Sequence, residues 1–182
     1  TACASGGQAL GLAMQVIRRG EADFMLAGGF DSMINPLGVS SFCLLGALST
    51  YNETPTTASR PFDGTRNGFV LGEGAAVLIL ESLEHATQRG AKILAEVTGY
   101  GATADAYHMT SPGPEGEGGA RAMGLAIKEA GIKPSDIQHV NAHATSTPVG
   151  DALETQGMKK IFGDHAGKLW ISATKSMTGH LL

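Results

Sequence analysis

The sequence has no long hydrophobic run, no excess of positive charge and only two cysteines among its 182 residues. Its longest apolar segment, around residues 75–80, is far shorter than the ~18 residues that a transmembrane helix requires, so we expect no membrane association. Thirteen basic against 17 acidic residues give a formal net charge of −4, which argues against nucleic-acid binding driven by overall charge. Two cysteines cannot form a disulfide framework, which favours a reducing, cytoplasmic compartment.

Several common functional signatures are also missing. The sequence contains no phosphate-binding loop, GxGxxG fingerprint or GxSxG elbow, and no CxxC pair that would suggest a metal site. His139 and His143 have an HxxxH spacing, but they lie in an expected strand and no cysteine or carboxylate completes a ligand set. We therefore expect no bound metal.

Glycine, by contrast, is abundant, with 26 residues that follow no collagen-like period. They indicate tight turns and close backbone contacts. An apolar content of 42% and a charged content of 16% allow a substantial core, and the length fits one domain or a large piece of a bigger one. Because the sequence opens within a motif at Thr1, we expect a fragment of a longer chain.

Strand-like apolar segments alternate with helical segments, which predicts a layered α/β fold with largely buried sheets. The predicted strands are residues 22–30, 69–80 (bent at Gly72-Glu73-Gly74), 93–100, 137–142 and 169–174. The predicted helices are a segment between Cys3 and Gly20, then residues 36–48, 82–89, 120–130 and 151–162. Two long loops, 51–68 and 104–119, separate them, and loops of this length in a compact domain are usually functional. No linker marks a domain boundary.

Cys3 is the strongest candidate nucleophile. It directly precedes a predicted helix, whose free N–H groups and positive dipole end favour thiolate over thiol and lower its pKa. The same N–H groups can donate to an oxyanion. The alternative is that Cys3 is a small buried apolar residue, as most free cysteines are. For Cys43, inside an apolar helix, burial is the preferred interpretation.

Two of the six histidines lie where a predicted strand gives way to a loop rich in Gly, Ser and Thr, and these are His143 and His180. Strand ends of this kind are where functional sites accumulate in layered α/β folds, although either histidine alone is compatible with a structural role. Lys175, five residues before His180, is either a solvated lysine or a cation that tunes the neighbouring histidine or thiolate. The remaining histidines that we interpret as surface or packing residues are His85, His139 and His165.

Four hydroxyl side chains are candidate ligand-binding groups. Thr145 and Thr147 alternate, so both can face one side of an extended segment, where they either hydrogen-bond an amide-bearing ligand or cap the following helix. Thr110 and Ser111 lie in the second long loop.

The order of these motifs resembles the β-ketoacyl-[acyl carrier protein] synthases, most closely the type II elongation enzymes. The resemblance covers essentially the whole chain and is carried by TACASG at 1–6, NAHATSTP at 141–148 and KSMTGH at 175–180. Further support comes from SRPFD at 59–63, GFVLGEG at 68–74 and AYHMTSP at 106–112.

This resemblance implies a thiolase-like fold of five layers, αβαβα, of which the chain would lack the N-terminal part and the C-terminal end. Residues 1–90 would belong to the end of the N-terminal half and residues 91–182 to most of the C-terminal half of one partial ketosynthase domain. The implied enzyme is a homodimeric acyltransferase of fatty acid synthesis that receives its substrates from acyl carrier protein. It needs no resident cofactor, because the acyl and malonyl thioesters are carried on the phosphopantetheine of that protein.

The resemblance also implies a role for each candidate residue. Cys3 would accept the acyl chain, and His143 and His180 would donate neutral N–H groups to the enolate formed by malonyl decarboxylation. Lys175 would support the His180 region electrostatically. The phosphopantetheine arm would be bound by the four hydroxyl residues Thr145, Thr147, Thr110 and Ser111.

Two positions depart from the family pattern. Ala144 replaces a glycine that usually follows the first histidine, and if its φ is positive the alanine costs on the order of 1 kcal/mol. Gly46 stands where bacterial enzymes often carry an arginine that contacts the acidic carrier protein. Three alternatives remain: a polyketide ketosynthase, a non-catalytic ketosynthase-like partner subunit, and a thiolase acting on coenzyme A thioesters.

Overall fold

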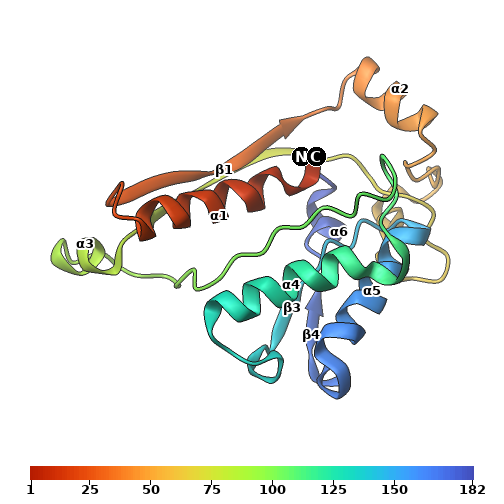
Figure 1. The fold of residues 1–182 in the computed structure, drawn as a ribbon. Coiled ribbons are helices and arrows are strands. Elements are labelled where there is room, and N and C mark those ends of the chain that lie inside the picture. Colours follow the sequence, from red (N-terminus) through yellow and green to blue (C-terminus); the bar gives the residue numbers. More distant parts are fainter.

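The computed structural model describes all residues 1–182 and shows two packed units (Figure 1). The first unit contains α1 (Ser5–Arg18) and an antiparallel pair of strands, β1 (Phe24–Ser32) and β2 (Glu73–Glu81). The second contains α4 (Glu117–Ala130), α5 (Pro148–Phe162) and a parallel pair, β3 (His139–Asn141) and β4 (Trp170–Ser172). The α/β prediction is confirmed.

In the first unit, α1 packs along the β1–β2 pair. Its apolar residues recur with helical spacing, and Ala13 and Met14 form a small buried core with Ala27 of β1 and Leu80 of β2. Gly11 allows close packing on the other side, because a Cβ there would collide with the Tyr100 ring. The register of β1 and β2 runs from Phe24 opposite Glu81 to Ser32 opposite Glu73.

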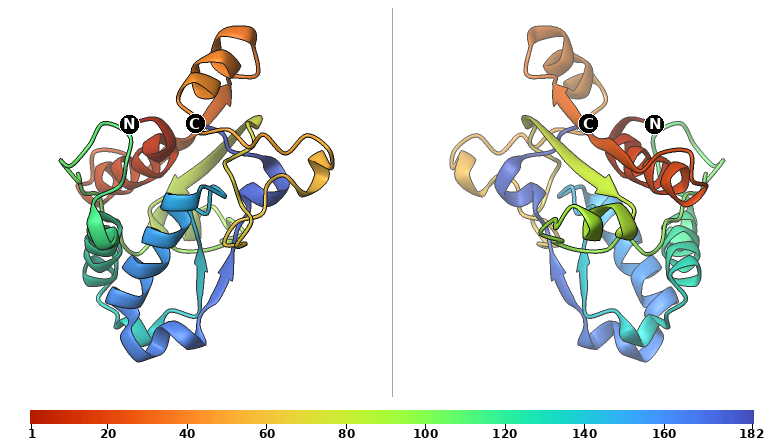
Figure 2. Two further views of the ribbon diagram at one scale, coloured as in Figure 1. Left: turned by 90° about the vertical axis from the view of Figure 1, so that its right-hand side faces the viewer. Right: turned by 90° about the vertical axis from the view of Figure 1, so that its left-hand side faces the viewer.

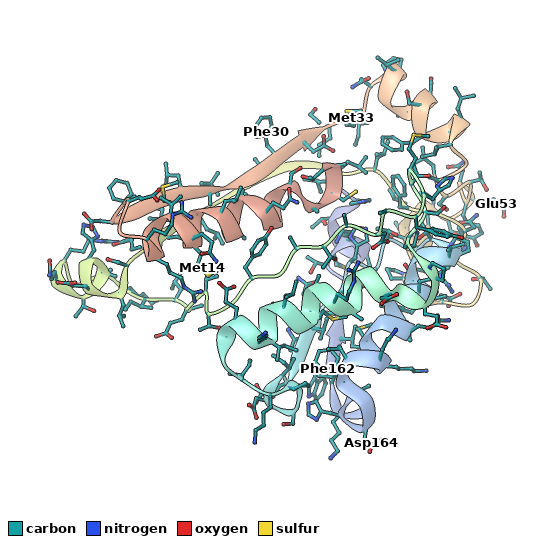
Figure 3. All side chains as sticks on the ribbon, viewed as in Figure 1. Met14, Phe30, Met33, Glu53, Phe162 and Asp164 are labelled. Atoms are coloured by element: carbon teal, nitrogen blue, oxygen red, sulfur yellow. The ribbon has the colours of Figure 1, made fainter.

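In the second unit, α5 lies between α4 and the β3–β4 pair (Figure 2). Gly116 precedes α4 with a left-handed φ of 64°, and a Cβ there would collide with the carbonyl of Leu153 on α5. The glycine therefore permits both the turn and the close contact between the two helices. Met158 and Phe162 near the end of α5 are buried, and Figure 3 labels Phe162.

The shorter elements precede, link or follow the main helices and strands of these units. They are helices α2 (Pro36–Leu44), α3 (Leu83–Gln88) and α6 (Lys175–Thr178), and the 3₁₀ turns η1 (Ala2–Ala4), η2 (Pro55–Thr57), η3 (Pro114–Gly116), η4 (Pro134–Asp136) and η5 (Gly163–Lys168). Ser82 caps α3 by accepting a hydrogen bond from the His85 N–H, as the sequence predicts. None of the helices is both long and apolar enough to cross a bilayer.

Several predicted boundaries differ from the structure, including the start of helix 151–162, which lies at Pro148, and one predicted strand does not form. Three of these differences have identifiable reasons. Helix α2 ends at Leu44, not at residue 48, because Gly46 takes a φ of 68° while the N–H groups of Gly46 and Ala47 bond back to Cys43 and Phe42 in a Schellman motif. Helix α4 begins three residues before 120, directly after the left-handed Gly116. The predicted strand 93–100 forms no ladder, because no strand of this chain pairs with it.

Burial of Cys43 is also a wrong prediction. Cys43 is exposed, since α2 projects from the body of the chain and only Gly38 of that helix is buried (Figure 1). Large apolar side chains of β1 are exposed as well, including Phe30 at 86%, which points away from the chain in Figure 3. An apolar pattern indicates a buried face only where this chain supplies something to cover it.

Candidate active site

Three segments that are distant in sequence converge at the start of α1. They are the η1 turn with Cys3, the loop after β3 with His143, and the turn after α6 with His180. The Cys3 sulfur and one ring nitrogen of each histidine all lie within 4.8 Å of one another. The structure therefore places the predicted nucleophile and the two predicted donors in one cluster.

Cys3 lies on a short turn with unusual backbone geometry. The Ala4 N–H closes η1 by donating to the Thr1 carbonyl at 3.3 Å, and Ala2 has a φ of 45°, which a non-glycine residue adopts at a cost of about 1–2 kcal/mol. Gly6 and Gly29 bring the start of α1 close to β1, since a Cβ on Gly29 would lie 3.5 Å from Gly6 Cα. Nothing in the sequence indicates the left-handed Ala2.

His143 is positioned by a carboxylate that the sequence analysis missed. The N–H groups of His143 and Ala144 donate to the two oxygens of Glu154 on α5, at 2.6 and 2.8 Å. Ala144 is 1% exposed and has a φ of 42°. This positive φ strains the backbone of an alanine, as the sequence analysis expects for this position. The paired hydrogen bonds offset that strain by fixing the backbone beside the imidazole.

His180 is fixed by backbone pairing with the segment before β2. Its N–H donates to the Val70 carbonyl at 2.7 Å, and its own carbonyl accepts from the Gly72 N–H at 2.8 Å. A Cβ on Gly72 would collide with the Thr178 carbonyl, which explains the glycine at the predicted bend. The His180 ring is 3% exposed and packs edge-on against the rings of Phe69 and His143, with centroids 5.2 and 5.3 Å away.

Both imidazoles are neutral near pH 7. Burial lowers the pKa of His180 to about 4, with His143 and the Lys175 ammonium acting in the same direction. Burial and then Lys175 also lower the pKa of His143, although Glu154 opposes them. A neutral imidazole can donate through one ring nitrogen and accept a proton on the other.

The pKa of Cys3 differs from the sequence expectation. The residue as a whole is exposed, yet neighbouring atoms remove water from the thiol, and this desolvation raises its pKa above the usual value. A backbone hydrogen bond at Cys3 and the charge of Lys175 lower it, but they do not outweigh desolvation. The resting residue is therefore a thiol that needs a proton acceptor, and the two neutral imidazoles lie beside it.

Lys175 begins α6 and is half-buried, so it is not the freely solvated lysine of one interpretation. Burial lowers its pKa, while the charges of Glu154 and Cys3 raise it. Its ammonium in turn lowers the pKa values of Cys3 and both histidines. The tuning role of Lys175 stays a prediction, and the half-buried position beside the cluster is compatible with it.

The candidate hydroxyls behave as two separate pairs. The Oγ1 atoms of Thr145 and Thr147 lie 3.0 Å apart on one side of their segment, and the Thr147 side chain makes no capping bond to α5. Thr110 and Ser111 lie on an exposed loop, where their N–H groups donate to His108 Nδ1 at 3.1 and 3.2 Å. No hydrogen bond joins this second pair to the cluster around Cys3.

The other histidines make structural contacts. His139 Nε2 lies 2.9 Å from Ser172 Oγ, and His165 Nε2 lies 2.7 Å from the Ile137 carbonyl oxygen. His85 Nδ1 lies 2.9 Å from the Glu81 carboxylate. His139 does not join His143 in a ligand cluster, because the HxxxH segment is partly extended strand.

Below His143, a buried polar network ties two loops together. Asp151, 1% exposed, accepts from the N–H groups of Ser146 and Phe62 at 3.1 and 2.8 Å and lies 3.4 Å from Arg66 Nε. Ser146 is fully buried. Its Oγ accepts a hydrogen bond from the Arg60 N–H, and its carbonyl oxygen accepts one from the Gly68 N–H. We call these contacts the loop network; they join the loop 60–68, which leads to Phe69, to the loop that carries His143.

Comparison with known proteins identifies the fold and the family. The model described as "Beta-ketoacyl synthase, N-terminal domain" matches residues 1–86, and that described as "Beta-ketoacyl synthase, C-terminal domain" matches residues 94–182. The chain belongs to the β-ketoacyl synthase family. The predicted family membership is therefore confirmed.

Individual ketosynthases are similar over the whole chain. The 3-oxoacyl-[acyl-carrier-protein] synthase 2 of Staphylococcus aureus is 54% identical over 182 residues, which are all of this chain and 45% of that protein. A solved complex of a type II polyketide synthase acyl-carrier protein with its hexaketide-bound ketosynthase contains a matching chain, with a TM-score of 0.96 and 46% identity over 99% of this chain and 44% of that one. A β-ketoacyl synthase from Burkholderia phymatum matches with a TM-score of 0.93 and 45% identity, over 100% of this chain and 43% of that one.

These matches confirm a thiolase-like fold over the part of a ketosynthase that this chain represents. The chain spans less than half the length of the relatives that it matches, at 45% of the Staphylococcus aureus protein. The five complete layers of the fold are not contained in it, since its strands form two separate pairs.

Proposed function

We propose that the whole protein is a β-ketoacyl-[acyl carrier protein] synthase, an acyltransferase that extends fatty acids by decarboxylative Claisen condensation. The observation that carries this proposal is the convergence of one thiol and two neutral imidazoles within 4.8 Å. A thiol beside a base supports acyl transfer, and two neutral donors support an enolate. The 54% identity to a 3-oxoacyl-[acyl-carrier-protein] synthase 2 agrees with this chemistry.

Acyl transfer is the first step. The Cys3 sulfur attacks the thioester carbonyl of an acyl-carrier protein while the thiol proton moves to a neighbouring imidazole, which is necessary because desolvation raises the pKa of Cys3. The carbon–sulfur bond to phosphopantetheine then breaks, and the departing thiolate takes up that proton. Both imidazoles are neutral again.

Decarboxylation and condensation follow. Malonyl-carrier protein loses CO₂, and the electron pair of the broken bond forms an enolate whose oxygen accepts hydrogen bonds from His143 and His180. A preorganised donor of this kind is worth ~3–4 kcal/mol in the transition state. The enolate carbon attacks the acyl carbonyl on Cys3, and the carbon–sulfur bond breaks with its electron pair on the sulfur. A 3-ketoacyl product two carbons longer leaves, and the Cys3 thiolate takes a proton from solvent to restore the resting thiol.

The other residues bind and tune in this scheme. Lys175 acts on the thiol and both imidazoles through its charge, and the paired hydroxyls of Thr145 and Thr147 hydrogen-bond the amides of the phosphopantetheine arm. Thr110 and Ser111 lie along the entrance in the complete enzyme. No resident cofactor is required, since the carrier protein supplies the substrates.

The complete protein would act as a cytoplasmic homodimer with acyl carrier protein as its partner. A structural relative is a ketosynthase in complex with an acyl-carrier protein, which supports that kind of partner. Because Gly46 supplies no positive charge, carrier-protein docking would use other basic residues.

A polyketide ketosynthase is the second candidate, and it is favoured by the 0.96 TM-score to a type II polyketide enzyme. Product analysis separates the two: a fatty-acid elongase gives one 3-ketoacyl extension per reductive cycle, and a polyketide enzyme gives poly-ketones. A non-catalytic partner subunit is disfavoured, because Cys3 and both histidines are present together.

The test is condensation by the full-length protein with acyl- and malonyl-carrier proteins. The native sequence is expected to form the 3-ketoacyl product, and Cys3→Ala is expected to abolish it. Cys43→Ala is the matched control, since Cys43 is exposed on α2 and should leave the rate unchanged. Full activity of Cys3→Ala would contradict the proposed function.

A further inference from the structure

The cluster at the start of α1 contains a set of ligand atoms that suits a thiophilic divalent cation. One sulfur, from Cys3, and one nitrogen each from His143 and His180 lie within 4.8 Å of one another. One thiolate with two imidazoles is a ligand combination that zinc accepts, with a fourth position left open. Motif spacing gave no indication of this set, because its members come from three distant segments.

The geometry is close to that of a zinc site. With Zn–S near ~2.3 Å and Zn–N near ~2.05 Å, tetrahedral ligand atoms lie about 3.4–3.6 Å apart, so the present atoms must approach by at most about 1.4 Å. His180 is fixed by its backbone bonds to Val70 and Gly72, but Cys3 lies on an exposed 3₁₀ turn. A change of the Cys3 side-chain rotamer can therefore shorten the two sulfur–nitrogen distances, and a small rotation of the His143 ring brings the two nitrogens together.

His180 provides a second, independent observation. The residue is only 3% exposed, and its Nδ1 atom has no hydrogen-bond partner. A buried polar atom without a partner is uncommon and is stabilised by whatever supplies one. A metal ion that binds Nδ1 gives this atom a partner, and an ion bound at either ring nitrogen fixes the ring tautomer.

The surrounding charges permit a cation. The Lys175 ammonium acts on all three ligands and opposes binding. Three carboxylates offset it: Asp31 of β1 acts on Cys3 and His180, and Glu154 and Asp151 of α5 act on His143. Deprotonation of Cys3 on binding adds a further negative charge directly next to the ion.

We propose that Cys3, His143 and His180 form a binding site for Zn²⁺ or a chemically similar cation, which occupies the site reversibly. On binding, the Cys3 S–H bond breaks, its proton passes to solvent, and the sulfur and two imidazole nitrogens each give a lone pair to the ion. No electron is transferred. The bound ion makes the sulfur unavailable as a nucleophile and removes both imidazoles as hydrogen-bond donors, so it inhibits condensation. This inhibition rests on the proposed function, but the binding of the ion does not.

The test uses the full-length protein without substrate and Co²⁺ as a spectroscopic probe for Zn²⁺. The native sequence and Cys43→Ala are expected to develop a cobalt–thiolate charge-transfer band at one ion per chain, and Zn²⁺ is expected to displace it. Cys3→Ala is expected to lose the band, and His143→Ala to weaken binding by about 100-fold. A stoichiometric band that survives Cys3→Ala, or no band in the native protein, would overturn the proposal.

A chemical measurement covers variants that fail to fold. Iodoacetamide alkylation of Cys3 in the native protein, followed by peptide mass spectrometry, is expected to slow at least tenfold with Zn²⁺ and to recover with a chelator, while Cys43 alkylation stays constant. Equal protection of both cysteines would show non-specific binding and reject the site. Metal binding without any condensation activity would leave this proposal standing and reject the proposed function alone.

Discussion

Cys3 and His143 face each other in the cluster, but their backbones are held very differently. Cys3 lies on an exposed turn that is closed only by local backbone hydrogen bonds, from Ala4 to Thr1 at 3.3 Å and from Ser5 to Ala2. His143 lies on a loop that two carboxylates fix: Glu154 accepts from two consecutive N–H groups, and Asp151 is the centre of the buried loop network. The Cys3 side chain is thus freer to change rotamer than His143, and the proposed roles of acyl acceptor and fixed donor use this difference.

The largest effect is expected from breaking the loop network. In Asp151→Ala, the N–H groups of Ser146 and Phe62 lose their acceptor and Arg66 loses its buried counter-charge. We expect the free energy of unfolding to fall by about 3–5 kcal/mol, measured by denaturant titration of the full-length protein. The exposed Asp164→Ala is the control and should change it by less than ~0.5 kcal/mol. A loss below 1 kcal/mol in Asp151→Ala would show that the network does not fix this side.

A smaller effect is expected when only the carboxylate next to His143 changes. Glu154→Gln keeps one acceptor oxygen but turns an amide donor toward the other N–H, which costs about 1.5–3 kcal/mol. Because the backbone of His143 then shifts, kcat for malonyl decarboxylation should fall by at least tenfold with little change in KM. An equal fall in kcat after Gln88→Glu, on exposed α3, would show that the effect is not local.

The pH dependence should also differ between the two sides. The folded pKa of His180, about 4, lies below the usual 6.5, so the unfolded chain binds more protons as the pH falls below 6.5. The free energy of unfolding should not depend on His180 above pH 6.5 and should decrease between pH 6.5 and about 4. Thermal unfolding at a series of pH values measures this decrease.

The pH dependence at Cys3 is expected at the alkaline end. The rate of iodoacetamide alkylation of Cys3 should keep rising above pH 9.0, the usual pKa of a thiol, because the pKa in the folded protein is higher. A plateau below pH 9.0 would contradict the desolvated thiol.

The smallest effect is expected at Ala144. Ala144→Gly removes the Cβ from a residue with a φ of 42°, which should stabilise the protein by up to about 1 kcal/mol, offset in part by the greater freedom of the unfolded glycine. Thermal unfolding checks the sign. Destabilisation by more than 1 kcal/mol would mean that packing around the buried Cβ outweighs the backbone strain.

Local patterns in the sequence were sufficient for most of the elements. The spacing of Leu10, Met14 and Ile17 predicts α1, and Ser82 predicts the start of α3, because periodicity and capping are properties of neighbouring residues. Residues 93–100 have a strand pattern but form no ladder, since pairing depends on a partner that the local pattern does not contain.

The site could be predicted only in part for the same reason. The reactive types Cys3, His143 and His180 were identified from their places at a helix start and at strand ends, and from their order along the chain. Glu154 and Asp151 were not, because a carboxylate on a helix is ordinary until the fold brings the loop N–H groups to it. The direction of the Cys3 pKa was also wrong, since desolvation depends on neighbours that are remote in sequence.

The most direct test of the central claim separates decarboxylation from acylation in the full-length protein. Release of CO₂ from malonyl-carrier protein is measured for Cys3→Gln and for a variant with both His143→Ala and His180→Ala. We predict that Cys3→Gln still releases CO₂ but forms no 3-ketoacyl product, and that the double histidine variant releases none. Loss of CO₂ release in Cys3→Gln together with its survival in the double histidine variant would contradict the assigned roles.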